Sequence, residues 1–199
     1  MNAIDHAIRI FENHNGFLHT QQAIRFGIAP RTLYQMRDSG TILCESRGLY
    51  RLASVDLSSN LDLVQVAMKI PKGVICLISA LSFQNLTTQI PHQVYVALPN
   101  YSEKPRLEYP PIRIFWLSQK AYSAGIEDHN LDGIIVKIYR IEKTVADCFK
   151  FRNKIGLDVA LEALREYRKS EAFNIETLLY YARIDRVERV IKPYLEAIL

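Results

Sequence analysis

The chain has 199 residues, of which 49% are hydrophobic and 23% charged, a composition typical of a globular protein with one large or two small domains. No apolar run approaches the roughly 20 residues that a bilayer span needs, which excludes a membrane-spanning helix. The net charge of +4 is a mild bias that is compatible with a nucleic-acid ligand.

The cysteines and the N-terminus indicate a cytoplasmic protein. Cys44, Cys76 and Cys148 lie far apart and are odd in number, and each sits in an apolar run, so we expect buried, reduced thiols. The N-terminal residues are polar and do not form a signal peptide. The five histidines lack metal-ligand spacing, so no metal site and no cofactor are expected.

The first part of the chain predicts three short helices. Residues 2–13 have apolar side chains at helical spacing. In the next helix Thr20 is the expected N-cap and Gly27 the stop, and Pro30 suits the first position of a third helix that ends before Gly40. The side chains expected to hold the second and third helices together are Ala23, Ile24, Phe26, Ile28, Leu33 and Met36.

A hairpin follows, with strands at residues 41–45 and 49–52 and a turn at Ser46–Gly48. A helix-turn-helix followed by a tight hairpin is a winged helix, whose second helix enters the major groove of DNA. Residues 1–53 also hold six arginines against four acidic residues, a net charge of 6 − 4 = +2. A helical hairpin that binds another protein is the alternative interpretation.

The candidate DNA-binding side chains fall into three groups. Arg31, Thr32, Gln35 and Arg37 lie on the outer face of the third helix, where arginine suits guanine and glutamine suits adenine. The remaining candidates are Thr20, Gln21 and Gln22 at the start of the preceding helix, Tyr34 beside a phosphate or at the edge of the core, and Arg47 at the wing tip, near a phosphate or the minor groove.

Residues 54–60 are polar and predict a linker, so we expect a winged-helix domain at 1–53 and a second domain at 61–199. The second domain predicts a mixed sheet with helices around it, followed by a helical C-terminal region, which makes the whole chain α+β. Its expected elements are a helix at 61–70, a buried run at 74–78, a helix at 79–86, strands at 93–98, 112–117 and 134–139, and helices from Ile141 onward. Asp185 is the expected cap of the last helix, which Pro193 should kink.

Several polar clusters in the second domain are weighed as catalytic groups. Glu142, Lys143, Thr144 and Asp147 are interpreted as structural, with Lys143 and Asp147 forming a surface ion pair four residues apart. The loose acidic group at a strand, interpreted mainly as turn chemistry, is Glu127, Asp128 and Asp132 with Lys137. The basic run interpreted as a solvated helix face is Arg140, Lys143, Lys150, Arg152 and Lys154. We expect no catalytic residue, and no enzyme.

Residues 141–164, which begin Ile-Glu-Lys-Thr-Val-Ala-Asp, and residues 73–81 resemble the C-terminal domain of AbiEi antitoxins. The N-terminal winged helix is similar to the domain that this family carries before it. The resemblance implies an antitoxin of a bicistronic system, active in phage defence, which represses its own operator and counteracts a nucleotidyltransferase-like toxin of the AbiEii type. The alternatives are a one-component transcription factor with an effector-binding C-terminal domain and a DNA-targeted nuclease.

Overall fold

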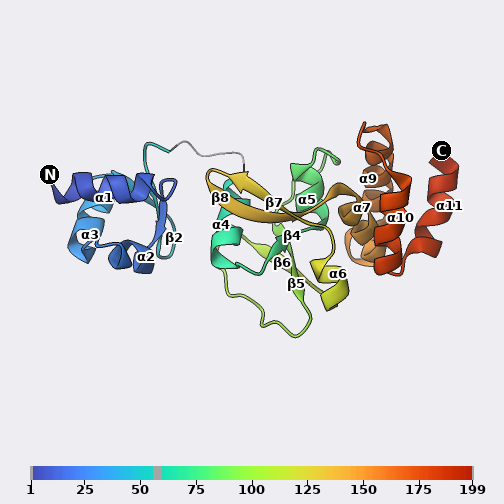
Figure 1. The fold of residues 1–199 in the computed structure, drawn as a ribbon, viewed down its shortest axis with the longest axis horizontal. Helices are drawn as coiled ribbons and strands as arrows, with labels where there is room; N and C mark the ends of the chain where they lie inside the picture. Colours follow the sequence, from blue (N-terminus) through green and yellow to red (C-terminus); the bar gives the residue numbers. More distant parts are fainter. Residues whose placement is uncertain (1, 56–59, 199) are drawn as a thin grey trace. The chain divides into compact units, whose positions relative to one another are not determined.

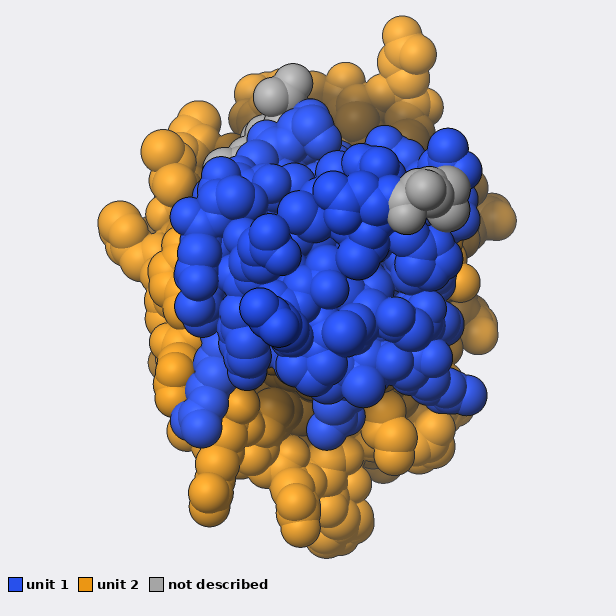
Figure 2. Space-filling model, turned by 90° about the vertical axis from the view of Figure 1, so that its left-hand side faces the viewer, with its two compact units in different colours: residues 1–61, 130–134 blue, residues 62–129, 135–199 orange. Residues whose placement is uncertain are grey.

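The structure, a computed structural model, describes residues 2–55 and 60–198 (Figure 1). The chain divides into two compact units (Figure 2). One is made of the residues up to Leu61 with Asn130–Ile134, and the other of Asp62–His129 with Ile135–Leu199. Most of the predicted linker, residues 56–59, lies outside the described residues. Among the helices that are described, none combines the length and the apolar character that crossing a bilayer requires.

The N-terminal unit contains three helices and a small antiparallel sheet, in which β3 is central in the order β1-β3-β2. Its elements are α1 (Ala3–Glu12), β1 (Phe17–His19), α2 (Thr20–Arg25), α3 (Pro30–Asp38), β2 (Ile42–Ser46) and β3 (Leu49–Leu52). The predicted helices and wing hairpin are confirmed. Strand β1 was not predicted, and it adds a third strand that ties the start of α2 to the wing.

The helix ends follow the chemistry of their flanking residues, with one exception. Pro30 is the first residue of α3, and Gly27 and Gly40 follow α2 and α3 with φ angles of +93° and +73°, a conformation that favours glycine. The predicted cap of α2 is wrong, because the N-cap is His19 and Thr20 is already the first helical residue.

The core of the N-terminal unit contains Leu33 and Met36 of α3, which are 1% and 0% exposed. Two predicted core residues lie outside it, since Ile24 is 46% and Phe26 41% exposed. The Phe26 ring packs on His14 instead, with ring centroids 4.2 Å apart. The core therefore fixes α3 through one face and leaves the opposite face to solvent.

The second unit is built on a mixed five-stranded sheet in the order β6-β5-β4-β8-β7. Strands β4 and β5 are antiparallel, whereas β5 with β6 and β4 with β8 are parallel. The strands are β4 (Val74–Ile75), β5 (Val94–Pro99), β6 (Ile112–Leu117), β7 (Ile126–Leu131) and β8 (Ile134–Tyr139). The predicted mixed sheet is confirmed, although β7 was not predicted.

Helices accompany this sheet and form the C-terminal region (Figure 1). They are α4 (Leu61–Lys69), α5 (Leu77–Phe83), α6 (Gln119–Ser123), α7 (Ile141–Lys150), α8 (Arg152–Ile155), α9 (Leu157–Lys169), α10 (Ile175–Ile184) and α11 (Glu188–Ile198). Helix α7 packs against α5, α9 and α10, and all of its residues from Glu142 to Phe149 are buried. It is the central helix of this unit.

The thiols depart from the prediction at one position. Cys76 and Cys148 are buried, and burial raises the pKa of both thiols well above the ordinary value. Cys44 is exposed on β2, so its predicted burial is wrong.

Candidate nucleic-acid interface

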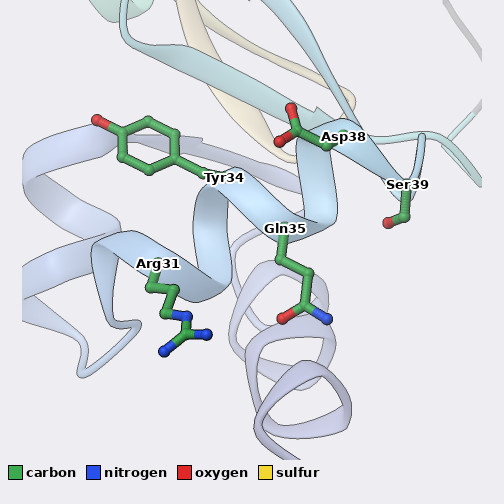
Figure 3. A pocket seen from close by; sticks show the side chains of 5 residues that line it. All are labelled: Arg31, Tyr34, Gln35, Asp38 and Ser39. Atoms are coloured by element: carbon green, nitrogen blue, oxygen red, sulfur yellow. The ribbon is translucent and has the colours of Figure 1, made fainter.

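The solvent-facing side of α3 forms an open hollow lined by Arg31, Tyr34, Gln35, Asp38 and Ser39 (Figure 3). Arg31 and Gln35 extend to the same side of the helix, whereas Tyr34 and Asp38 extend to the other. Residues four apart are neighbours on a helix surface, which explains both pairs. We call Arg31 and Gln35 the reading pair.

The reading pair has its polar groups available for a ligand. Both side chains are exposed, and neither makes a side-chain hydrogen bond or an ion pair with another described residue. A guanidinium offers a planar fork of donors, and an amide offers one donor group beside one acceptor. These two groups match the base edges of the major groove, guanine for arginine and adenine for glutamine.

Arg37, the other predicted arginine of α3, is engaged within the protein. Its Nε and Nη2 atoms both donate to Oδ1 of Asp38, at 2.9 Å and 2.8 Å. Its guanidinium carbon lies 5.1 Å from the centre of the Tyr34 ring. The hydrogen bond and the charge of Asp38 raise the pKa of Arg37. The structure therefore separates Arg37 from the reading pair, although all three were predicted as one group.

The start of α2 is bonded to the wing turn. The carbonyl of Gly48 accepts hydrogen bonds from the backbone nitrogen of Thr20 at 2.9 Å and from its hydroxyl at 3.3 Å. Gln22 uses its side-chain oxygen to accept from the backbone nitrogen of His19, at 3.0 Å. Both predicted side chains therefore have structural roles, while Gln21 is exposed.

The other candidates differ in their exposure. Arg47 is exposed in the wing turn, and Thr32 is half-buried on α3. Arg51, which contributed to the basic bias of the sequence, is buried, and its Nε donates to Glu45 at 2.7 Å. It therefore holds the two long strands of the wing together and adds no charge to the exposed surface.

In the second unit, Lys143 and Asp147 do form the predicted ion pair, with Nζ and Oδ1 2.5 Å apart, but its predicted place on the surface is wrong. The side chains of Lys143 and Asp147 are 0% and 1% exposed. Nζ of Lys143 also lies 3.1 Å from Oδ2 of Asp185, whose Oδ1 pairs with Lys150 at 3.1 Å. The basic run is therefore not a solvated face, since two of its lysines take part in this buried cluster.

Asp185 has a different role from the predicted one. It is the C-cap of α10 rather than the cap of α11, and its carboxylate joins α10 to α7. Burial raises the pKa of Asp147 to about 7, with Asp185 adding to the effect and Lys143 opposing it. Burial lowers the pKa of Lys143, but the two carboxylates outweigh it and raise the pKa overall. Only the fold brings Asp185 to Lys143, 42 residues earlier, so no local sequence signal could have found the cluster.

Of the acidic residues beside β8, Glu127 is paired, Asp128 is exposed on β7 and Asp132 lies in the hairpin turn. Oε2 of Glu127 lies 3.8 Å from Nε2 of His129, and Oε1 of Glu127 lies 3.8 Å from Nε of Arg140. Nζ of Lys137 donates to the carbonyl of Pro71 at 3.3 Å. Asp132 has a φ angle of +51° in the turn. Within residues 2–55 and 60–198, no three His, Cys, Asp or Glu side chains are grouped so as to hold a metal ion.

Comparison with known proteins supports the fold and finds one family model that is similar to the first domain. The crystal structure of the RV2827C protein from Mycobacterium tuberculosis matches with a TM-score of 0.58 at 10% identity, over 96% of this chain and 79% of the other. At that identity the likeness shows the fold alone. No curated protein matches the chain. Residues 7–53 match the model of the family described as transcriptional regulator, AbiEi antitoxin.

Proposed function

We propose that this protein is a transcriptional regulator that binds duplex DNA through α3. The observation that carries the proposal is the reading pair, Arg31 and Gln35, which is exposed on one side of α3 with no partner among the described residues. The rest of the domain supports it, since winged helices contact phosphates through the helix before the recognition helix and through the wing, to which α2 and the wing turn correspond. The match of residues 7–53 to a regulator family agrees with this role.

The spacing of the reading pair gives the proposal a more specific form. An α-helix rises 1.5 Å per residue, so residues four apart are separated by about 6 Å along its axis. Stacked base pairs are about 3.4 Å apart. With α3 lying along the major groove, Arg31 and Gln35 contact a guanine and an adenine about two base pairs apart.

The test is a fluorescence anisotropy titration of the full chain with the duplex upstream of its own coding sequence and with a scrambled duplex of equal composition. Arg31→Ala is expected to lower the affinity for the upstream duplex by about 1–3 kcal/mol, roughly 5- to 150-fold. Arg9→Ala is the matched control, because Arg9 is an exposed arginine on α1. Equal affinity of the unaltered chain for both duplexes, or equal losses in the two variants, would contradict the proposal.

We also propose that the protein is an antitoxin that counteracts a nucleotidyltransferase-like toxin of the AbiEii type, through its second unit and without catalysis. The support is the AbiEi description of the matched family and the resemblance of residues 73–81 and 141–164 to the C-terminal antitoxin domain. The test is co-expression with the adjacent gene, scoring growth. Rescue by the Arg31→Ala variant would assign neutralisation to the second unit, and absence of rescue by the unaltered chain would contradict the antitoxin role.

A further inference from the structure

The two exposed arginines of α3 differ in what surrounds them. Arg31 has no ion pair with another described residue, whereas Arg37 gives two donors to one oxygen of Asp38 and lies beside the Tyr34 ring. The side chains of Arg37 and Asp38 are 45% and 66% exposed, so water and ions reach both. The pair is therefore in ready exchange with any other anion near α3.

The donors that Arg37 gives to Asp38 are those that it would give to DNA. Nε and one Nη of a guanidinium form the fork that binds phosphate or carboxylate, so a carboxylate there occupies the place of a backbone phosphate. Asp38 also carries a negative charge of its own, which repels a phosphate that approaches Arg37. The Tyr34 ring on the other side limits the positions to which the guanidinium can swing.

We propose that Asp38 competes with the DNA backbone for Arg37 and so lowers the affinity of this protein for duplexes of arbitrary sequence. The inference rests on the proposed DNA-binding function. It assigns Asp38 as a positioning residue that acts through Arg37, while the reading pair recognises the bases. A contact to a DNA phosphate adds the same affinity whatever the base sequence. Losing one such contact therefore makes base contacts a larger fraction of the binding free energy.

The experiment measures the affinity of the full chain for a random-sequence duplex over a series of salt concentrations. Asp38→Asn frees Arg37 for a phosphate, and one added phosphate contact steepens the slope of log K against log salt by about 0.9. A surface ion pair of this kind shifts an equilibrium by about two- to fivefold, so the low-salt affinity is expected to rise by that factor.

Two further variants test whether Asp38 acts through Arg37. In an Arg37→Gln background the change in slope caused by Asp38→Asn is expected to disappear, because the competing side chain is gone. Glu12→Gln removes an equal charge from an exposed residue on α1 and is expected to change the slope less. Melting temperatures of all variants report whether the fold is kept.

The outcomes separate this inference from the function on which it rests. If the unaltered chain does not bind duplex DNA, the proposed function fails and the inference fails with it. If Arg31→Ala weakens binding but Asp38→Asn leaves the salt slope unchanged, or changes it equally without Arg37, only the inference is overturned. It is also overturned if Asp38→Asn alters the preferred base at one position of a selected duplex, because Asp38 would then be reading a base itself.

Discussion

Replacing Arg51 tests how the wing is held together. This arginine of β3 is 4% exposed, and its Nε donates to Glu45 of β2 at 2.7 Å. Its Nη1 donates to the backbone carbonyls of Leu52, at 3.1 Å, and Val55. Arg51→Met keeps most of the side-chain volume but leaves one carboxylate and two carbonyls without this donor.

The size of the loss follows from the burial of the partners. Removing one member of a buried ion pair costs about 3–5 kcal/mol, and the lower end applies because the Glu45 side chain is 13% exposed. Domains have a free energy of unfolding of about 0.05–0.15 kcal/mol per residue, so a loss of about 3 kcal/mol is a large share of the stability of a domain of this size. The wing that carries Arg47 is therefore expected to loosen first.

Amide hydrogen exchange is the suitable assay, because it reports the stability of the β2–β3 hairpin separately from the second unit. Arg9→Met, the same substitution at an exposed position, is expected to change the opening free energy measured by hydrogen exchange by less than about 0.5 kcal/mol. The double variant Arg51→Met with Glu45→Met is expected to recover part of the loss, since an apolar pair replaces the buried charges. A loss below about 1 kcal/mol in Arg51→Met, or no recovery in the double variant, would refute the reasoning.

Two further predictions concern the second unit and the thiols. The pKa of Asp147 is raised from 3.8 to about 7, so the folded chain binds a proton at this carboxylate more tightly than the unfolded chain does. Protonation of Asp147 therefore contributes free energy of unfolding that is fully present below about pH 4 and is lost as the pH rises through about 7. Urea unfolding followed by fluorescence of Trp116, the single tryptophan, is expected to show this decline, and Asp147→Asn to flatten it; equal slopes in both proteins would contradict the assignment. For the thiols, we expect a disulfide-exchange reagent to modify Cys44 rapidly in the folded protein, and Cys76 and Cys148 only on unfolding. Rapid reaction of all three would contradict their burial.

The local features of the N-terminal domain could be predicted because they are set by neighbouring residues. Pro30 and Gly40 delimit α3 through constraints on their own backbone, and the spacing of Leu33 and Met36 fixes which face is buried. The face that carries the reading pair follows directly. Strand β1 could not be found in this way, because three residues give no periodicity and β1 exists through its pairing with β3.

Some structural features could not be predicted from the sequence, chiefly those that depend on contacts between distant residues. A lysine and an aspartate four residues apart are most often a surface pair, and only the packing of α10 on α7 brings Asp185 to Lys143 and encloses the cluster. The pairing of Arg37 was missed for a different reason, since its partner Asp38 is the next residue in the chain. Adjacent residues on a helix point in different directions, so the contact between Arg37 and Asp38 forms only because the arginine side chain is long enough to reach the carboxylate.

The most direct test of the central claim is to map where duplex DNA contacts the chain. The isotope-labelled full chain is titrated with the duplex upstream of its own coding sequence, and the backbone amide signals are followed by NMR. The account predicts shifts concentrated on α3, at the start of α2 and in the wing turn, and their loss in an Arg31→Ala, Gln35→Ala variant. Unchanged signals on α3 at saturating duplex, or shifts confined to the second unit, would contradict it.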